Sequence, residues 1–163
     1  MEIVQLNANA KLSEHFTLGE FTKSNSHPEI YNIPSHEAIA NMKRLCGWLE
    51  VLREASPGPT ASPGPSKRRG APIIINSGYR SPQLNRKIGG APNSNHLTGC
   101  AVDIRVSGME QLIRYAAILL DYADESKQEF DELLIEKNRY GAIWLHFAVR
   151  PSGNRRKVCF INA

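Results

Sequence analysis

The sequence has no apolar run that approaches the ~20 residues of a membrane-spanning helix. Its first residues, MEIVQLNANAKLSEHF, lack the basic start and the continuous apolar stretch of a secretory signal. We therefore expect a protein that is cytoplasmic as synthesised and has no membrane partner. It would act in the cytosol, or at the cell wall after release by a route that the chain does not encode.

Cysteine is scarce, and its spacing excludes two kinds of site. Cys46, Cys100 and Cys159 are odd in number and far apart, with no CxxC pair. This argues against a disulfide framework and against a zinc site made of thiolates. Cys46 falls on the apolar side of an expected helix, so we interpret it as a buried core thiol.

Motifs for nucleic-acid binding are also absent. The net charge of +4 suits an anionic partner such as nucleic acid or a cell-wall polymer, but a solvated surface explains it equally well. The basic clusters at 67–69 and 155–157 are short and are not interleaved with aromatic residues. We therefore expect no nucleic-acid partner.

The remaining composition is that of a globular protein. A length of 163 residues with 41% hydrophobic and 22% charged residues predicts a single domain over 1–163. Within residues 55–72 the unit Ala-Ser-Pro-Gly-Pro occurs twice. Repeated Pro-Gly cannot hold a helix or a central strand, so this stretch is expected to be a surface loop.

Helix signals dominate the first two thirds of the chain, and strand signals dominate the last third. Apolar residues at helical spacing follow a Ser35 cap, at Ile39, Met42, Leu45, Leu49 and Leu52. Shorter helices are expected at 17–22, after Ser81-Pro82 as far as Gly89-Gly90, and from the capping pattern at 107–110. Strands are expected at 73–75, 101–106, 131–136, 143–149 and 157–161. This order predicts an α+β fold with a mostly antiparallel sheet and helices packed on it.

A histidine and an aspartate near the middle of the chain can converge on one metal ion. His96 and Asp103 carry ligand atoms that zinc accepts, and a chain reversal between them is needed for both to reach it. Thr98-Gly99 can supply that reversal, because glycine accepts positive φ. Alternation along the following strand points Asp103 to one face and its neighbours to the other.

A third ligand is available at His146, which lies among apolar residues in an expected strand. A buried histidine in such a place is ordinarily a hydrogen-bonded core residue, and the same holds for His96 taken alone. Their occurrence together with Asp103 favours a metal site. Three nitrogen and oxygen ligands without cysteine leave a fourth position for water, as in catalytic zinc sites.

These residues form a pattern known from peptidases. The motif SxHxxGxAxD at 94–103, followed by WxH at 144–146, resembles the zinc D-alanyl-D-alanine carboxypeptidase family. That family includes L-alanyl-D-glutamate endopeptidases of peptidoglycan and shares its fold with the hedgehog signalling domain. The similarity extends upstream through IIINSGYRSPQLNRKIGGAPNSNH and covers roughly 73–150.

The resemblance implies a role for each residue of the pattern. His96, Asp103 and His146 would be the zinc ligands, and Arg80 in SGYRS would be the active-site arginine. An arginine offers a fork of donors to a substrate carboxylate or to a developing oxyanion, although a surface ion pair is its ordinary role. Ser94 would either cap the metal loop or bind substrate through a hydrogen bond.

The general base departs from the family pattern. The family usually places Glu or His three to five residues before the last ligand, where this chain has GAI at 141–143. The nearest acid is Glu136. A hairpin that pairs 136 with 143 puts Glu136 on the face opposite His146, and a bulge or another register returns it. Strand-end acids usually face solvent, but related sequences often carry such a glutamate, and we interpret Glu136 as the catalytic base.

The sequence therefore favours a zinc metallopeptidase that hydrolyses peptidoglycan peptide bonds involving D-amino acids. It would be a D-Ala-D-Ala carboxypeptidase or an endolysin-type endopeptidase, a monomer, with peptidoglycan stem peptides or D-Ala-containing peptides as partners. Two alternatives stay open. One is a catalytically inactive zinc-binding relative that acts as a binding module, and the other is a structural domain with core histidines.

Overall fold

The computed structural model describes residues 7–24, 26–56 and 71–163, and these form helices around one sheet. The helices are α1 (Leu18–Thr22), α2 (His36–Ala55), α3 (Pro82–Lys87) and α4 (Met109–Ser126), with a 3-10 helix, η1, at Asn95–Thr98. The strands are β1 (Ile75–Ser77), β2 (Ala101–Arg105), β3 (Glu132–Lys137), β4 (Ile143–Ala148) and β5 (Lys157–Asn162). None of the described helices is long and apolar enough to cross a membrane.

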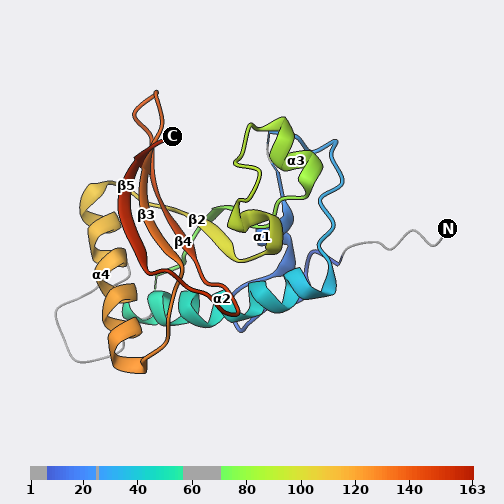
Figure 1. The fold of residues 1–163 in the computed structure, drawn as a ribbon. Coiled ribbons are helices and arrows are strands. Elements are labelled where there is room, and N and C mark those ends of the chain that lie inside the picture. Colours follow the sequence, from blue (N-terminus) through green and yellow to red (C-terminus); the bar gives the residue numbers. More distant parts are fainter. Residues whose placement is uncertain (1–6, 25, 57–70) are drawn as a thin grey trace.

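The strands lie in the order β1-β2-β4-β3-β5. All neighbouring pairs are antiparallel except β3 and β5, which run parallel. The predicted α+β fold with a mostly antiparallel sheet is therefore confirmed. Figure 1 shows α4 beside the sheet, α2 beneath it, and α3 on the side away from α4.

Two local predictions were wrong in detail. The isoleucine run predicted a strand at 73–75, but pairing with β2 begins only at Ile75 and is irregular before Ser77. Helix α4 is not opened by a Ser107 capping box, because its N-cap is Gly108, which has no side chain to cap with. The side chain of Gln111 instead accepts a hydrogen bond from the Ser107 backbone amide, at 2.7 Å.

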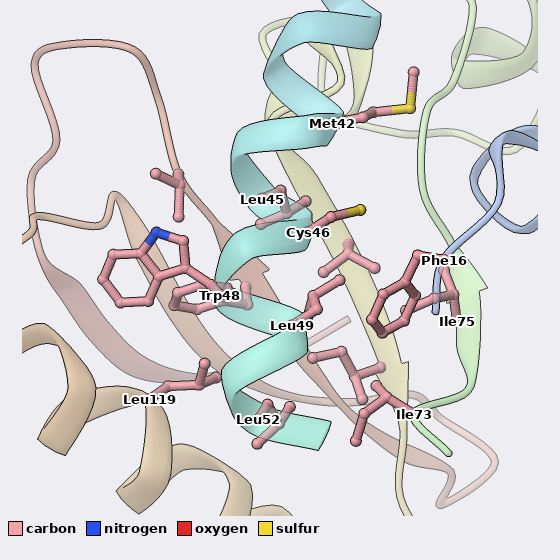
Figure 2. Packing of buried hydrophobic residues seen from close by; sticks show 14 of the residues in the cluster. Phe16, Met42, Leu45, Cys46, Trp48, Leu49, Leu52, Ile73, Ile75 and Leu119 are labelled. Carbon is pink, nitrogen blue, oxygen red and sulfur yellow. The ribbon is translucent and has the colours of Figure 1, made fainter. Parts of the chain in front are cut away.

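Helix α2 supplies the middle of the core. Ser35 caps it by accepting a hydrogen bond from the Ala38 amide at 3.1 Å, as predicted. Its apolar residues point into the core, where Figure 2 shows Trp48 and Leu52 near Leu119 of α4. The Trp48 ring also packs edge-on against Tyr122 and Phe130 and lies tilted on Phe147; these and further buried side chains make one cluster.

The predicted core thiol is part of this cluster. Cys46 is fully buried on α2 (Figure 2). Burial raises the pKa of its thiol to about 12. A thiol with so high a pKa stays protonated and inert, so Cys46 contributes packing and no chemistry.

The sheet has one apolar face and one polar face. Val102, Ile104, Leu145 and Phe147 alternate with the site residues along β2 and β4, and they are buried in the helix-covered core. Because successive strand side chains point to opposite faces, the residues between them face away from these helices. The fold thus leaves one face of the central strands free for chemistry.

The doubled Ala-Ser-Pro-Gly-Pro stretch lies almost wholly in 57–70, outside the described residues. The residues that flank this gap meet, because the Ala71 amide donates a backbone hydrogen bond to the Ser56 carbonyl at 3.2 Å. The chain therefore returns to the end of α2 before it enters the sheet.

Gly99 fixes the approach of the His96 loop to α2, and this can be tested. Its φ is +74°, and a Cβ placed on it would lie 2.5 Å from the Ala38 carbonyl oxygen. We expect Gly99→Ala to lower the free energy of unfolding by about 3 kcal/mol, since backbone strain and a clash add up. Gly141→Ala is the control, because its φ of +88° is similar but no atom lies within 4 Å. It should cost about 1 kcal/mol. Urea denaturation of both variants measures the difference, and equal losses would contradict the close approach.

Candidate active site

Strand pairing sets Asp103 directly beside His146. The register of β2 and β4 places the two residues opposite each other, with their side chains on the polar face. Asp103 Oδ1 lies 3.0 Å from Nδ1 of His146. Two of the three residues predicted to bind a metal are thus neighbours on adjacent strands.

His96 reaches the same aspartate from the loop before β2. It lies in η1, which Ser94 caps by accepting a hydrogen bond from the His96 amide at 3.2 Å. Gly99 ends η1 in the left-handed conformation, so the predicted reversal occurs at this glycine. Nε2 of the buried His96 lies 3.3 Å from Asp103 Oδ1.

The three side chains form a compact group of potential metal ligands. Their ligand atoms, two imidazole nitrogens and a carboxylate oxygen, all lie within 4.8 Å of one another. A second group, Glu14, His15 and Glu50, meets the same distance criterion but is largely exposed. There the Glu50 carboxylate is already used by hydrogen bonds from Ser13 and His15. The group of His96, Asp103 and His146 is therefore the better candidate metal site, because its ligand atoms are the more shielded from water.

Each histidine of the buried group has its other nitrogen held by a second partner. Nδ1 of His96 donates to the Gly78 carbonyl at 2.6 Å, which leaves Nε2 to face Asp103. Nε2 of His146 donates to Glu132 Oε1 at 3.1 Å, which leaves Nδ1 to face Asp103. Metal-binding histidines usually have such outer partners, because these fix the tautomer and the ring orientation.

The charges around the group favour a cation. Burial alone would lower the pKa of His146, but its hydrogen bonds to Asp103 and Glu132, with the charge of Glu136, raise this pKa to about 10. Burial lowers the pKa of His96. Although burial also favours a neutral Asp103, the two histidines hold the pKa of this carboxyl well below its usual range.

Glu136 lies on the same face as His146, contrary to the face expected from pairing 136 with 143. The hairpin pairs Glu136 with Trp144 and Leu134 with His146. A one-residue change in register moves every side chain of a strand to the other face, so no bulge is needed. Glu136 Oε1 lies 3.6 Å from Nδ1 of His146, and Oε2 accepts a hydrogen bond from the Trp144 indole at 2.9 Å. Burial and the nearby charge of Asp103 raise the pKa of Glu136.

Arg80 lines the same cavity with an unused donor. Its Nη1 donates to Asn85 at 3.1 Å, but its Nε is buried and has no hydrogen-bond partner in the described part of the chain. Burial lowers the pKa of this guanidinium, and the charges of Asp103 and Glu136 oppose that shift. An unpaired buried donor is costly, and Arg80 carries this cost at the wall of the cavity.

Three polar residues that sequence reasoning missed hold the site together. Asp131 is fully buried and accepts hydrogen bonds from Asn95 and from Arg155, which binds it through Nε and Nη2. Asn95 also donates to Glu132, the partner of His146. The contacts of Asp131, Asn95 and Glu132 therefore tie η1 to the start of β3 and to the segment before β5. The sequence held one signal for Glu132: it is four residues before Glu136 on the same predicted strand, so the two side chains lie on one face of the sheet.

The polar face of the sheet borders one cavity of about 750 Å³. Its lining includes all of the predicted site residues, which are Arg80, Ser94, His96, Asp103, Glu136 and His146. A volume of this order suits a ligand of several residues rather than a single ion. The polar face of the sheet therefore carries a binding cleft, and the potential metal group is part of its lining.

A comparison with protein families agrees with this geometry. Residues 66–130 match the family model of peptidase M15. The match confirms the resemblance to the M15 zinc peptidases. It spans Arg80, Ser94, His96 and Asp103 and ends before Glu136 and His146. No curated protein matches the chain. At the level of the family, the match supports a metallopeptidase that acts on peptides.

The network around Asp131 gives a stability prediction. Burial would raise the pKa of Asp131, but the hydrogen bonds from Arg155 and Asn95 bring it down to about 2. A pKa below the unfolded value means that this carboxylate stabilises the fold above about pH 4, and that the contribution is lost as pH falls toward 2. We expect Asp131→Asn to lower the free energy of unfolding at pH 7 by about 2 kcal/mol, less than for a fully buried pair because its arginines are partly exposed.

The matched control is Asp124→Asn, which breaks an exposed pair with Arg156. It should cost less than about 1 kcal/mol. Urea denaturation from pH 7 to pH 2 would show the wild type and the Asp131→Asn variant converging at the acid end. If the two aspartate variants lose equal stability at pH 7, the network does not hold the site together.

Proposed function

We propose that the protein is a zinc-dependent peptidase that hydrolyses peptide bonds of peptidoglycan involving D-amino acids. The observation that carries this proposal is the convergence of His96, Asp103 and His146 in a cleft that also holds Glu136. Both carboxypeptidase and endopeptidase activity are compatible with the residues present. As expected from the sequence, we propose that the protein works as a monomer. It would be made in the cytoplasm and would act in the cytosol, or at the cell wall after release.

The chemistry of the donor set fits zinc. Two imidazole nitrogens and one carboxylate oxygen, with no thiolate, are the ligand types of catalytic zinc sites, which keep one position open. His96 Nε2, Asp103 Oδ1 and His146 Nδ1 would hold the ion, with Gly78 and Glu132 as outer partners. When bound, zinc would acidify water and polarise the scissile carbonyl.

Glu136 is the residue best placed to move the proton. The Trp144 indole holds Oε2, so Oε1 remains turned toward His146. A raised pKa brings a carboxylate closer to the value at which a general base accepts and returns a proton efficiently near neutrality. Glu136 would take a proton from the attacking water at Oε1 and deliver it to the departing amine.

Arg80 and Ser94 would bind the substrate. The partly buried guanidinium of Arg80 lines the cleft, where it can donate to a substrate carboxylate or to the oxyanion that develops at the scissile carbonyl. The Ser94 hydroxyl accepts from the His96 amide, so its own proton can still be donated to a ligand in the cleft.

The position of Glu136 favours an enzyme over an inactive binding module. A module that only binds zinc or a wall fragment needs no acid on the face of the ligand group. Burying a carboxylate in such a place disfavours its ionised form. Its contacts there are a hydrogen bond from the Trp144 indole and an approach of 3.6 Å to Nδ1 of His146, so the acid is directed at the ligand group.

Two variants separate catalysis from metal binding. We expect Glu136→Gln to lower the rate of hydrolysis of peptidoglycan peptides by roughly 10²–10⁴ while zinc stays near one per chain, because a base is not a ligand. His146→Ala should lose zinc and activity together. The measurements are fragment release by mass spectrometry and metal content after dialysis.

Glu129→Gln, an exposed glutamate outside the cavity lining, serves as the control and should change neither quantity. Full turnover by Glu136→Gln would show that another group is the base. A wild-type protein that keeps no zinc and gains no thermal stability from it would refute the metal site itself.

A further inference from the structure

One end of the cleft carries a group of cations that the proposed hydrolysis does not use. Arg150, Arg155 and Lys157 line the same cavity as the ligand group. Arg155 and Lys157 lie beside Glu132, and Arg150 lies beside Asp131. Glu132 is four residues from Glu136 on β3, or roughly 13 Å along the strand. Arg80 interacts with Glu136 and Asp103, whereas Arg155 interacts with Asp131 and Glu132. The cleft therefore has positive charge at both ends.

The two arginines are held in place through one side of each guanidinium. Arg155 uses Nε and Nη2 to bind Asp131, at 3.0 and 2.8 Å. Arg150 uses Nε, which donates to Asn95 at 2.9 Å and lies 3.2 Å from Asp131. A guanidinium has five N–H donors, and no hydrogen bond to a described residue uses Nη1 of Arg155 or either terminal nitrogen of Arg150. Because Asp131 and Asn95 already hold the two guanidinium groups, their remaining N–H donors lose little conformational entropy when a ligand binds.

Lys157 completes the group from β5. It is paired with Glu132 in the parallel register of β3 and β5, so it shares the polar face of the sheet. Within the described ranges its ammonium makes no ion pair, and the three cations outnumber the two carboxylates of Asp131 and Glu132. One positive charge in excess and several free donors thus remain at this end of the cleft.

We propose that Arg150, Arg155 and Lys157 form a subsite that binds a carboxylate of the peptide substrate. Lys157 lies two strand spacings across the sheet and two residues along it from His146, which is about 12 Å. An extended peptide covers that distance in about three residues. The subsite therefore selects substrates with an acidic group two or three residues from the cleaved bond, on the side away from Glu136. This inference rests on the proposed function, because it assumes that the peptide crosses the ligand group.

The test compares pairs of synthetic peptides that differ in one carboxylate. Each pair contains a cleavable bond next to a D-amino acid and either Glu or Gln two or three residues from it, on either side. A parallel pair has a C-terminal acid or amide at the same spacing, which distinguishes a side-chain from a main-chain carboxylate. In one of these pairs we expect the wild type to hydrolyse the peptide with the carboxylate at a kcat/KM about tenfold above that of the matching peptide with the carboxamide.

Lys157→Gln and Arg150→Gln should each reduce that preference to about twofold, and 0.5 M NaCl should reduce it in the wild type. Lys137→Gln is the matched control, because this exposed lysine of β3 is not part of the cavity lining. It should keep the full preference. Calorimetric binding of the same peptides to the Glu136→Gln protein measures the preference without turnover.

The outcomes separate the subsite from the enzyme. Cleavage with equal kcat/KM for all acid and amide pairs, or a preference that survives in both cleft variants, overturns the subsite and leaves the peptidase intact. A preference lost equally in Lys137→Gln also overturns it, because the cause would be net charge. The protein could also cleave no peptide and yet bind the acid peptides more tightly than the amides. If Lys157→Gln removes that binding preference, the subsite is upheld and the proposed hydrolysis is refuted.

Discussion

The antiparallel pairing of β4 with both of its neighbours is the constraint on which the site depends. β4 places His146 opposite Asp103 on one side and opposite Leu134 on the other, so that Glu132 and Glu136 lie diagonally from His146 on β3. A slip of one residue on either side would turn the acids of that strand into the apolar core. The same alternation that buries Leu145 and Phe147 against the helices therefore assembles the polar cleft.

Buried polar residues add the precision that the sheet alone cannot supply. His96 comes from a loop, and its position relative to His146 depends on Gly78, Asn95 and Asp131 rather than on strand pairing. Each of these contacts satisfies a buried donor or acceptor that would otherwise be costly. Stability and site geometry are thus coupled, because the network that holds η1 to β3 is also the one that orients a histidine.

Much of this site could be predicted from local sequence patterns, and the rest depended on distant contacts. His96, Gly99 and Asp103 lie within eight residues, so one motif and one glycine were enough to predict that they converge. The face of Glu136 could not be predicted in this way, because it depends on the loop at 138–142. There the Asn138 side chain accepts hydrogen bonds from the Tyr140 and Ala142 amides and Gly141 takes positive φ, which sets the register. Asn95 and Asp131 are 36 residues apart, beyond the reach of any local pattern.

The central claim is that His96, Asp103 and His146 hold one zinc ion, with Nδ1 of His146 facing the metal. Diffraction from zinc-soaked crystals, recorded on both sides of the zinc absorption edge, tests this most directly. The account predicts one strong anomalous peak in contact with His96 Nε2, an Asp103 carboxylate oxygen and His146 Nδ1, with His146 Nε2 still bonded to Glu132. The absence of a peak there, or a stronger one at Glu14, His15 and Glu50, would contradict it.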